Sequence, residues 1–454
     1  MGRLFGTNGI RGVVNKEMTA ELALKIGRAL GTYFKSGRVL VGMDGRTSGV
    51  MLKSALTSGL LSAGVDVVDV GLAPTPAIQY ATKNSGARGS VIITASHNPA
   101  EFNGIKVVDY DGIEISTADE GVVESLYYSE RFHTADWLGL GKLENRMDIL
   151  EPYKVGILRK VRTDLIKKAN LKVVIDSANS VGGLVTPYLT AIAGCETVTI
   201  NTHIDGLFPG RDPEPNDDTL TVLKKTVLSS GADLGIAHDG DADRVVFVDE
   251  GGVFLTGDKT FALLIKKALT DKGGGKVVTP IASSNLIKDV TEEFGGELVT
   301  TRVGSVVVAR TLKEVEGLIG GEENGGIFYS PHQYVRDGAM GAMLLLEYIA
   351  EAGKPLSKLV AGLPKYYQIK KKVKCSEQVK DALLRKLREE LKNYEVDTTD
   401  GLKILLEKGW VLIRPSGTEP IIRCYAESHT RHEAERLSSW GLKLINDQME
   451  KTQG

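Results

Sequence analysis

The sequence has little cysteine, little net charge and no long apolar run. Its three cysteines lie far apart without a C-x-x-C pair, which argues against a disulfide framework or a zinc site and is typical of a reducing cytoplasm. The formal net charge is −2, so electrostatics give no reason to expect nucleic acid or an anionic membrane as a partner. No stretch approaches the roughly 18 apolar residues that span a bilayer, and the first residues lack a signal-peptide core. We therefore expect a cytoplasmic protein.

The remaining composition is that of a globular protein with several domains. Hydrophobic residues make up 42% and charged residues 25% of the 454 residues, a length that exceeds one core and suits three or four domains. The 52 glycines are scattered along the chain. This distribution indicates many tight turns between strands and helices rather than a disordered segment.

Strand-like and helix-like segments alternate over most of the chain. Thr19 is expected to cap a helix, and a strand, a helix and a strand are predicted at Val39–Gly42, Met51–Ala63 and Val65–Val70. The alternation restarts near Tyr153, and this pattern is typical of βαβ units with largely parallel sheets. Further strands are predicted at Leu171–Ile175, Asp233–Ala237, Val245–Val248, Lys276–Thr279 and Glu297–Thr300.

The pattern changes after Lys365. A charged amphipathic helix with apolar positions from Val379 to Leu391 precedes three short strands, and a last helix starts near His432. Close strands joined by short turns favour an antiparallel sheet with helices on one face. We therefore predict an α/β protein with three tandem α/β domains of mixed sheets and a smaller C-terminal α+β domain. The expected domain boundaries are 1–150, 151–250, 251–367 and 368–454.

Three alternating carboxylates, Asp239, Asp241 and Asp243, lie between two predicted strands. Carboxylates that converge on one point repel each other unless a cation lies among them, and hard oxygen ligands suit Mg²⁺. An EF-hand is the competing metal site, but its loop requires glycine where Arg244 stands, and the flanks have the pattern of strands. A solvated acidic turn is the alternative without metal.

A second polar loop follows the strand-like run Val91–Ile93. It presents Ser96 beside His97, and a serine held on a rigid strand end can act as a covalent relay. His97 can donate a hydrogen bond there, and Lys106 can approach the same point. Arg11 lies in a glycine-bounded turn that suits a phosphate clamp. The structural alternatives are a surface charge for Lys106 and a loop cap for His97.

Two further loops carry groups that suit a phosphorylated sugar. The segment Gly321–Gly326 offers Glu322 and Asn324, whose carboxylate and amide can bond adjacent hydroxyls in fixed directions. The segment Arg414–Pro420 combines an arginine fork, hydroxyls and a glycine that lets backbone N–H groups approach an anion, with an ordinary hairpin turn as the alternative. The expected phosphate contacts are Arg414, Ser416, Gly417, Thr418 and Arg423.

These four loops, in this order along the whole chain, resemble those of the α-D-phosphohexomutase family. The resemblance implies four domains around a central cleft, with one loop from each. It implies an isomerase that moves a phosphate between O1 and O6 of a hexose through a phosphoserine and a hexose bisphosphate intermediate. On this resemblance Ser96 carries the phosphate, and Asp239, Asp241 and Asp243 hold Mg²⁺ together with a phosphate oxygen. Hexose phosphates are the expected partners.

The resemblance also implies roles for the other residues. Lys106 would act as general acid or base at the sugar hydroxyl; a base must be unprotonated, which burial near another cation favours. Arg244 would reach the substrate side of the metal loop. Glu322 and Asn324 would bind O3 and O4 of the sugar, and the loop of Arg414 would bind the phosphate that is not transferred.

The sequence departs from the family pattern at two positions near these loops. Gly326 stands where the family often has histidine, and the nearby His332 is a candidate to replace it. Met43 stands where arginine is common, so no role is assigned there. The segment Arg302–Ser305 is a further candidate to face the substrate.

The motifs give two expectations for the sugar. The start Phe5–Gly12 is similar to phosphoglucosamine mutases, although Asn8 stands where that subgroup usually has aspartate, whereas Gly321–Gly326 is similar to archaeal mutases of mixed mannose and glucose specificity. We expect a phosphoglucosamine mutase of broad specificity, with a phosphomannomutase/phosphoglucomutase as the alternative. A non-catalytic phosphosugar-binding protein and a phosphatase are the alternatives from other classes, and a homo-oligomer is possible.

Overall fold

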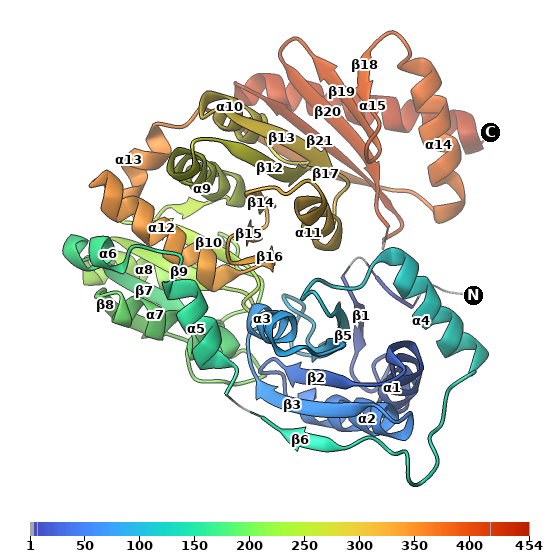
Figure 1. Ribbon diagram of the computed structural model, residues 1–454. Coiled ribbons are helices and arrows are strands. Elements are labelled where there is room, and N and C mark those ends of the chain that lie inside the picture. Colours follow the sequence, from blue (N-terminus) through green and yellow to red (C-terminus); the bar gives the residue numbers. More distant parts are fainter. Residues whose placement is uncertain (1–3, 7, 147, 418, 454) are drawn as a thin grey trace.

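The computed structural model describes residues 4–6, 8–146, 148–417 and 419–453. Its four sheets follow one another along the chain around an arc, from the first sheet in blue to the C-terminal sheet in red (Figure 1). Helices pack on each sheet, so the predicted fold class of three α/β units and a C-terminal α+β unit is confirmed. Among the described residues, every helix is too short or too polar to cross a bilayer.

The first part of the chain forms a six-stranded sheet and four helices. The strands are β1 (Ile10–Val13), β2 (Arg38–Met43), β3 (Asp66–Leu72), β4 (Gly89–Ile93), β5 (Phe102–Asp109) and β6 (Leu143–Asn145). The helices are α1 (Ala20–Phe34), α2 (Gly49–Ser62), α3 (Thr75–Ser85) and α4 (Thr117–Ser129). Thr19 caps α1 as predicted, because its hydroxyl accepts from Leu22 N at 3.2 Å. The strand order is β1-β5-β4-β2-β3-β6, and neighbouring residues of β2, Val39 and Leu40, enter hydrophobic cores on opposite faces.

The second and third sheets have five strands each. The second part contains α5 (Leu150–Leu158), α6 (Thr163–Ala169), β7 (Lys172–Asp176), the 3₁₀ turn η1 (Val181–Leu184), α7 (Thr186–Ile192), β8 (Glu196–Ile200), α8 (Thr221–Ser230), β9 (Leu234–His238), β10 (Val245–Asp249) and β11 (Phe254–Leu255). The third contains α9 (Gly257–Lys272), β12 (Gly275–Pro280), α10 (Asn285–Glu293), β13 (Gly296–Thr301), α11 (Ser305–Glu314), β14 (Ile319–Gly321), β15 (Ile327–Tyr329), β16 (Gln333–Arg336), α12 (Gly338–Ala352) and α13 (Leu356–Ala361).

The expectation of largely parallel sheets is only partly correct. The pairs β2–β4, β7–β9 and β12–β14 are parallel, but β4–β5, β9–β10 and β14–β15 are antiparallel. A short connection between neighbouring strands permits only the antiparallel arrangement, since a parallel return needs a long crossover. The strand pairs that carry the polar loops are therefore among the exceptions, together with β1–β5, β10–β11 and β15–β16.

The C-terminal part is an antiparallel sheet of order β17-β21-β20-β19-β18, as predicted. Its helix α14 buries Leu383 and Leu387, two apolar positions of the predicted amphipathic helix. The elements are β17 (Tyr367–Lys374), α14 (Glu377–Glu390), β18 (Glu395–Asp397), β19 (Leu402–Leu406), β20 (Gly409–Pro415), β21 (Ile421–Ser428) and α15 (Arg431–Gln453).

The first three sheets share one hydrophobic core. It includes Ile78 from α3, Tyr153 from α5, Phe261 from α9 and Met343 from α12. The hydroxyl of Tyr153 also donates to Asp337, the N-cap residue of α12, at 2.7 Å. This continuous core fixes the first three parts against one another.

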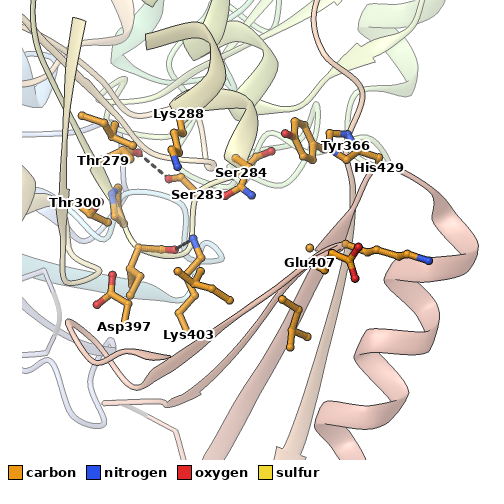
Figure 2. Close-up of a pocket in the computed structure, with 18 residues that line it drawn as sticks. Thr279, Ser283, Ser284, Lys288, Thr300, Tyr366, Asp397, Lys403, Glu407 and His429 are labelled. Carbon is orange, nitrogen blue, oxygen red and sulfur yellow. Dashed lines mark hydrogen bonds between the residues drawn. The ribbon is translucent and has the colours of Figure 1, made fainter. Parts of the chain in front are cut away.

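The C-terminal sheet has its own core and meets the third part at a smaller interface. There Trp410 packs with Ile281, and Lys403 Nζ donates to the Ile281 carbonyl at 3.0 Å. A cavity of about 350 Å³ lies at this interface, with Lys403 and Asp397 facing Thr279 and Thr300 (Figure 2). Burial lowers the pKa of Lys403 to about 8 against the opposing effect of nearby carboxylates, including Asp397.

Candidate active site

Each of the four polar loops joins two antiparallel neighbours in a sheet. The strand pairs are β4 with β5, β9 with β10, β14 with β15, and β20 with β21. Contacts between side chains link the serine segment to the aspartate loop, and the aspartate loop to the third part. Three different sheets thus contribute to one buried polar cluster.

Ser96 lies on the tight turn after β4 and is buried, with a left-handed backbone φ of 52°. Such a conformation costs a residue other than glycine about 1–2 kcal/mol, so the turn must be held by its surroundings. Thr94 holds it directly, because its hydroxyl oxygen accepts from Ser96 N at 2.8 Å. The Ser96 hydroxyl donates to Asp239 Oδ2 at 2.7 Å, and His97 Nδ1 lies 3.4 Å from Ser96 Oγ.

Arg46 encloses the serine loop from inside the first domain, although no motif in the sequence indicates it. Its guanidinium donates at 2.5–2.9 Å to four backbone carbonyls of the loop, those of Ser96, Asn98, Pro99 and Phe102. Its Nε pairs with Asp44 Oδ2 at 3.2 Å, and the same carboxylate oxygen accepts from Thr94 Oγ1 at 2.6 Å. A fully buried ion pair therefore fixes the turn that presents the serine.

The three aspartates of the second loop converge as the sequence predicts. Asp239, Asp241 and Asp243 are buried, and each offers a carboxylate oxygen within 4.8 Å of the others. Oδ1 of Asp241 and Oδ1 of Asp243 are buried without a hydrogen-bond partner. Burial and the charges of Asp243 and Asp241 raise the pKa of Asp239 well above its usual range. The cluster has the oxygen donors and the electrostatic need for a metal ion.

Two cations from other sheets contact this cluster. Lys106, in β5, donates to Asp241 Oδ2 at 2.7 Å and to Asp243 Oδ2 at 3.0 Å. Arg336, at the end of β16, pairs with Asp243 Oδ2 at 2.5 Å. Lys106 is buried rather than a surface charge, and the carboxylates of Asp241 and Asp243 outweigh burial and raise its pKa. Contrary to the expectation from burial alone, these two carboxylate contacts favour the charged form of the lysine.

A second group of cations lies near Ser96, and its Arg244 Nε is also 4.0 Å from Asp239 Oδ2 and from Asp243 Oδ1. Arg244 Nη1 pairs with Glu214 Oε1 at 3.3 Å, and His97 Nε2 lies 3.5 Å from Glu214 Oε2. Arg11 Nη1 donates to Asn98 Oδ1 at 2.7 Å, and burial lowers the pKa of Arg11 to about 10. Burial, followed by the charges of Arg244 and Arg11, lowers the pKa of His97 to about 2, so its imidazole is neutral. Glu214 was not indicated by any sequence motif.

The Gly321–Gly326 loop lies directly against the aspartate loop. Val245 N donates to the Gly325 carbonyl at 3.0 Å, and an isolated antiparallel bridge joins Arg244 to Gly326. Glu322 is buried, and its Oε2 lies 3.4 Å from Arg336 Nη1. The sugar-binding candidate Glu322 is therefore adjacent to the carboxylate cluster.

The other members of this loop have local roles in the structure. Asn324 Oδ1 accepts from Gly326 N at 3.1 Å, which closes the turn. His332 does not take the place of the missing loop histidine: its ring stacks on Tyr80 at 4.9 Å and its Nε2 lies 3.4 Å from Asp337. The suggestion that His332 replaces a histidine at Gly326 is therefore wrong, because this ring is occupied in the contact between the first and third parts.

The C-terminal loop is connected to the third part through one carboxylate. Arg414 Nε pairs with Asp400 Oδ2 at 2.6 Å, and the same oxygen accepts from Val303 N at 3.0 Å. Ser416 Oγ accepts from Glu419 N at 3.2 Å, and Arg423 Nη2 pairs with Glu419 Oε2 at 2.8 Å. A Cβ added at Gly417 would meet no described atom within 4 Å, whereas Thr418 lies outside the described residues. Arg302 is exposed beside Val303.

Comparison with family models assigns the chain. Four models match in the order of the chain: "Phosphoglucomutase/phosphomannomutase, alpha/beta/alpha" domains I, II and III and the corresponding C-terminal domain, at residues 2–134, 151–252, 256–367 and 371–439. The chain belongs to the phosphoglucomutase/phosphomannomutase family. This confirms the resemblance to α-D-phosphohexomutases, so the protein is a phosphohexomutase, an isomerase.

Individual members of the phosphoglucomutase/phosphomannomutase family match over nearly the whole chain. A "Phosphoglucomutase/phosphomannomutase" of Thermococcus kodakarensis is 49% identical, and a "Phosphoglucosamine/phosphogalactosamine mutase" of Sulfurisphaera tokodaii is 46% identical; each match covers 98% of this chain and 99% of the relative. A crystal structure of a family protein from Burkholderia thailandensis aligns with a TM-score of 0.89 at 30% identity, over 98% of both chains. The fold is therefore that of the family throughout.

Proposed function

We propose that this phosphohexomutase moves phosphate between O1 and O6 of a hexose phosphate through a phosphorylated Ser96 and a hexose bisphosphate. The observation that carries the proposal is the contact between Ser96 Oγ and Asp239 Oδ2 at 2.7 Å, which joins a constrained serine to a buried carboxylate cluster. The phosphorus–oxygen bond to Ser96 breaks and a bond to the free sugar hydroxyl forms. The bisphosphate then returns its other phosphate to Ser96.

The cations around the serine have distinct roles in this proposal. Arg11, Arg244 and His97 would donate to the phosphate oxygens as charge redistributes. Lys106 donates to Asp241 and Asp243, and these carboxylates raise its pKa against the effect of burial. It would give a proton to the oxygen that leaves phosphorus and take up the proton that the attacking sugar hydroxyl loses, which is a general acid–base role.

The aspartate cluster fits Mg²⁺. Asp239, Asp241 and Asp243 supply hard carboxylate oxygens within 4.8 Å of one another, and two of these residues have a buried oxygen without a partner. When bound, Mg²⁺ would neutralise the serine phosphate and make its phosphorus more electrophilic. The phosphate on Ser96 would complete the ligand set, because Ser96 already contacts Asp239.

The sugar and its second phosphate would be held by the other two loops. Glu322 and Asn324 would bind O3 and O4, and the short distance from Glu322 to Arg336 supports a position beside the reacting group. Arg414, with Ser416, Gly417, Thr418 and Arg423, would hold the phosphate that is not transferred. Among the described residues Arg414 bonds Asp400 through Nε, so the Nη groups of the fork would be its donors to this phosphate.

We propose glucosamine phosphate as the first substrate, within a broad range that includes glucose and mannose phosphates. The similar relatives carry names for glucose and mannose in one case and for glucosamine and galactosamine in another. Galactosamine differs from glucosamine at C4, so its 1-phosphate tests whether the enzyme reads O4. The division of labour among residues 1–150, 151–250, 251–367 and 368–454 is supported by one polar loop in each range. The second sheet extends past residue 250, because β11 pairs with β10.

The decisive experiment replaces the nucleophile. Ser96→Ala should abolish isomerisation of glucosamine 1-phosphate and remove a fraction of the wild-type protein that is heavier by about 80 Da, one phosphoryl group. Ser90→Ala is the matched control, since Ser90 lies in β4, the strand before the turn of Ser96, and accepts from the Thr82 hydroxyl instead. Near-normal turnover in a folded Ser96→Ala protein would refute the mechanism, and release of inorganic phosphate in place of the isomer would indicate a phosphatase.

A further inference from the structure

Arg336 occupies a position between two functional loops that no motif assigns. It is buried at the last residue of β16, where Phe328 pairs with it across the sheet. The next residue, Asp337, caps α12 by accepting from Met340 N at 2.9 Å and also accepts from Gln333 Nε2 at 2.8 Å. The backbone that carries Arg336 is thus fixed on both sides, so its guanidinium has a defined direction.

The guanidinium of Arg336 lies between the carboxylate of Asp243 in the aspartate loop and that of Glu322 in the Gly321–Gly326 loop. Its Nη2 lies 2.5 Å from Asp243 Oδ2, and its Nη1 lies 3.4 Å from Glu322 Oε2. All three side chains are at most 7% exposed. Burial alone would lower the pKa of Arg336, but Asp243 and Glu322 outweigh it and raise the pKa, which indicates a strong local field.

Gly326 provides the space that this arginine needs. A Cβ at Gly326 would lie 2.5 Å from Arg336 Cδ and 3.0 Å from Glu322 Oε2, closer than real Cβ contacts allow or nearly so. The backbone does not demand glycine there, because Gly326 is absent from the residues with positive φ. A side chain at Gly326 and the present position of Arg336 therefore exclude each other.

We propose that Arg336 is a positioning residue that couples Glu322 to Asp243, and that Gly326 makes room for it. The inference rests on the proposed function, in which Asp243 binds metal and Glu322 binds the sugar. Arg336 holds the Glu322 carboxylate in the direction of the sugar hydroxyls. It also pairs with Oδ2 of Asp243, so its positive charge opposes a metal ion that would bind the unpartnered Oδ1 of the same carboxylate.

These two contacts predict two effects of opposite sign in Arg336→Met, a change that keeps the apolar stem and removes the charge. Measured by calorimetry in a Ser96→Ala background, affinity for Mg²⁺ should rise at least about fivefold, since one unit charge at about 4 Å has that effect in water and a larger one at a buried site. Affinity for glucose 1-phosphate, measured in chelator, should fall about tenfold or more, because Glu322 loses a charge-assisted partner. Arg336→Lys should recover part of the sugar affinity.

The matched control is Arg162→Met. Arg162 also pairs with carboxylates of α12, Glu347 and Glu351, but about three turns further along that helix. Arg162→Met should leave the affinities for Mg²⁺ and for glucose 1-phosphate within twofold of those of the Ser96→Ala protein. A joint loss of metal and sugar affinity in Arg336→Met, or no change in either, would overturn the coupling, since a purely structural residue would not shift the two in opposite directions.

A double-substitution cycle tests the role of Gly326. Gly326→Ala alone should weaken glucose 1-phosphate binding by displacing the arginine, whereas in an Arg336→Ala background it should have almost no further effect. Additive losses would overturn the idea that the glycine makes room for Arg336. These binding measurements also separate the inference from the proposed function: absence of mutase turnover in the wild type would refute the function, and unchanged binding in the variants would refute the coupling.

Discussion

Replacing Arg46 should release the loop that presents the serine. Arg46→Met keeps the length of the side chain, but it leaves the buried Asp44 carboxylate unpaired and removes the donors to four loop carbonyls. Breaking a buried ion pair by removing one partner costs about 3–5 kcal/mol. Loss of the hydrogen bonds to the four carbonyls adds little to this cost, because a loosened loop can turn those carbonyls towards water. The loss should be confined mainly to β4 and β5.

Hydrogen exchange of the intact protein, followed on peptides from β4 and β5, measures this loss locally. A chain of several domains has no single unfolding equilibrium, so a melting curve would mix contributions from parts that the substitution does not touch. At 1.4 kcal/mol for each factor of ten, protection should fall by roughly two to three and a half powers of ten. Phosphate on Ser96 should fall in parallel, because the serine would leave its constrained turn.

The matched control is Arg38→Met, an exposed arginine of the neighbouring strand β2. It should change protection of the same peptides by less than about threefold, since exposed substitutions change stability by about half a kilocalorie per mole. If hydrogen-exchange protection of these peptides in Arg46→Met stays within fivefold of the wild type, the hydrogen bonds from Arg46 to the loop carbonyls do not hold the loop, and the reasoning is refuted. Arg46→Lys should give an intermediate loss, because an ammonium cannot reproduce the fork.

Four further outcomes follow from the described contacts. Excess chelator should abolish mutase activity and Mg²⁺ should restore it, and Asp241→Asn should need far more metal; full activity under either condition would exclude the metal site. Arg414→Lys should lower kcat/KM about ten- to a hundredfold on bisphosphate-forming substrates, with unchanged kinetics counting against the clamp. Glu322→Ala should damage glucosamine, glucose and mannose 1-phosphates alike, and a loss confined to one sugar would show that O3 and O4 are not its targets. The pKa of Lys403 is about 8 in the fold and near 10.5 when unfolded, so the unfolded chain binds the extra proton between these values and stability rises with pH across that window. Hydrogen-exchange protection of β19 peptides, corrected for the intrinsic exchange rate at each pH, should rise from pH 8 to 10 less steeply in Lys403→Met, and equal slopes would disprove the assignment.

Much of the site could be predicted because its main parts are contiguous in sequence. A turn at the end of a strand determines where Ser96 lies, and the alternation of Asp239, Asp241 and Asp243 between two strands makes their side chains converge. The strands themselves were visible from apolar runs, and the cap at Thr19 from its hydroxyl. Interactions among residues close in sequence were sufficient to predict these features.

The residues that were missed are single side chains from distant parts of the chain. Arg46, Glu214 and Arg336 have no motif of their own, and each acquires its role only when the fold brings another loop to it. One signal did exist: the small residue at Gly326 left a space that another side chain had to fill. The nearby His332 was the wrong choice for it, because a planar ring beside Tyr80 and Asp337 already had partners in a domain contact.

The origin of the cations around Asp241 and Asp243 has a consequence for how the protein matures on the ribosome. The contact from Lys106 to Asp243 spans 137 positions of the chain and that from Arg336 spans 93, so the second sheet emerges after one cation and before the other. While the third part is still being synthesised, Asp243 has Lys106 and the more distant Arg244 beside it but lacks Arg336. The carboxylates of the loop then repel one another more strongly than in the complete fold. Arrival of β16 lowers that repulsion, so we expect the aspartate loop to settle only after that strand has left the exit tunnel.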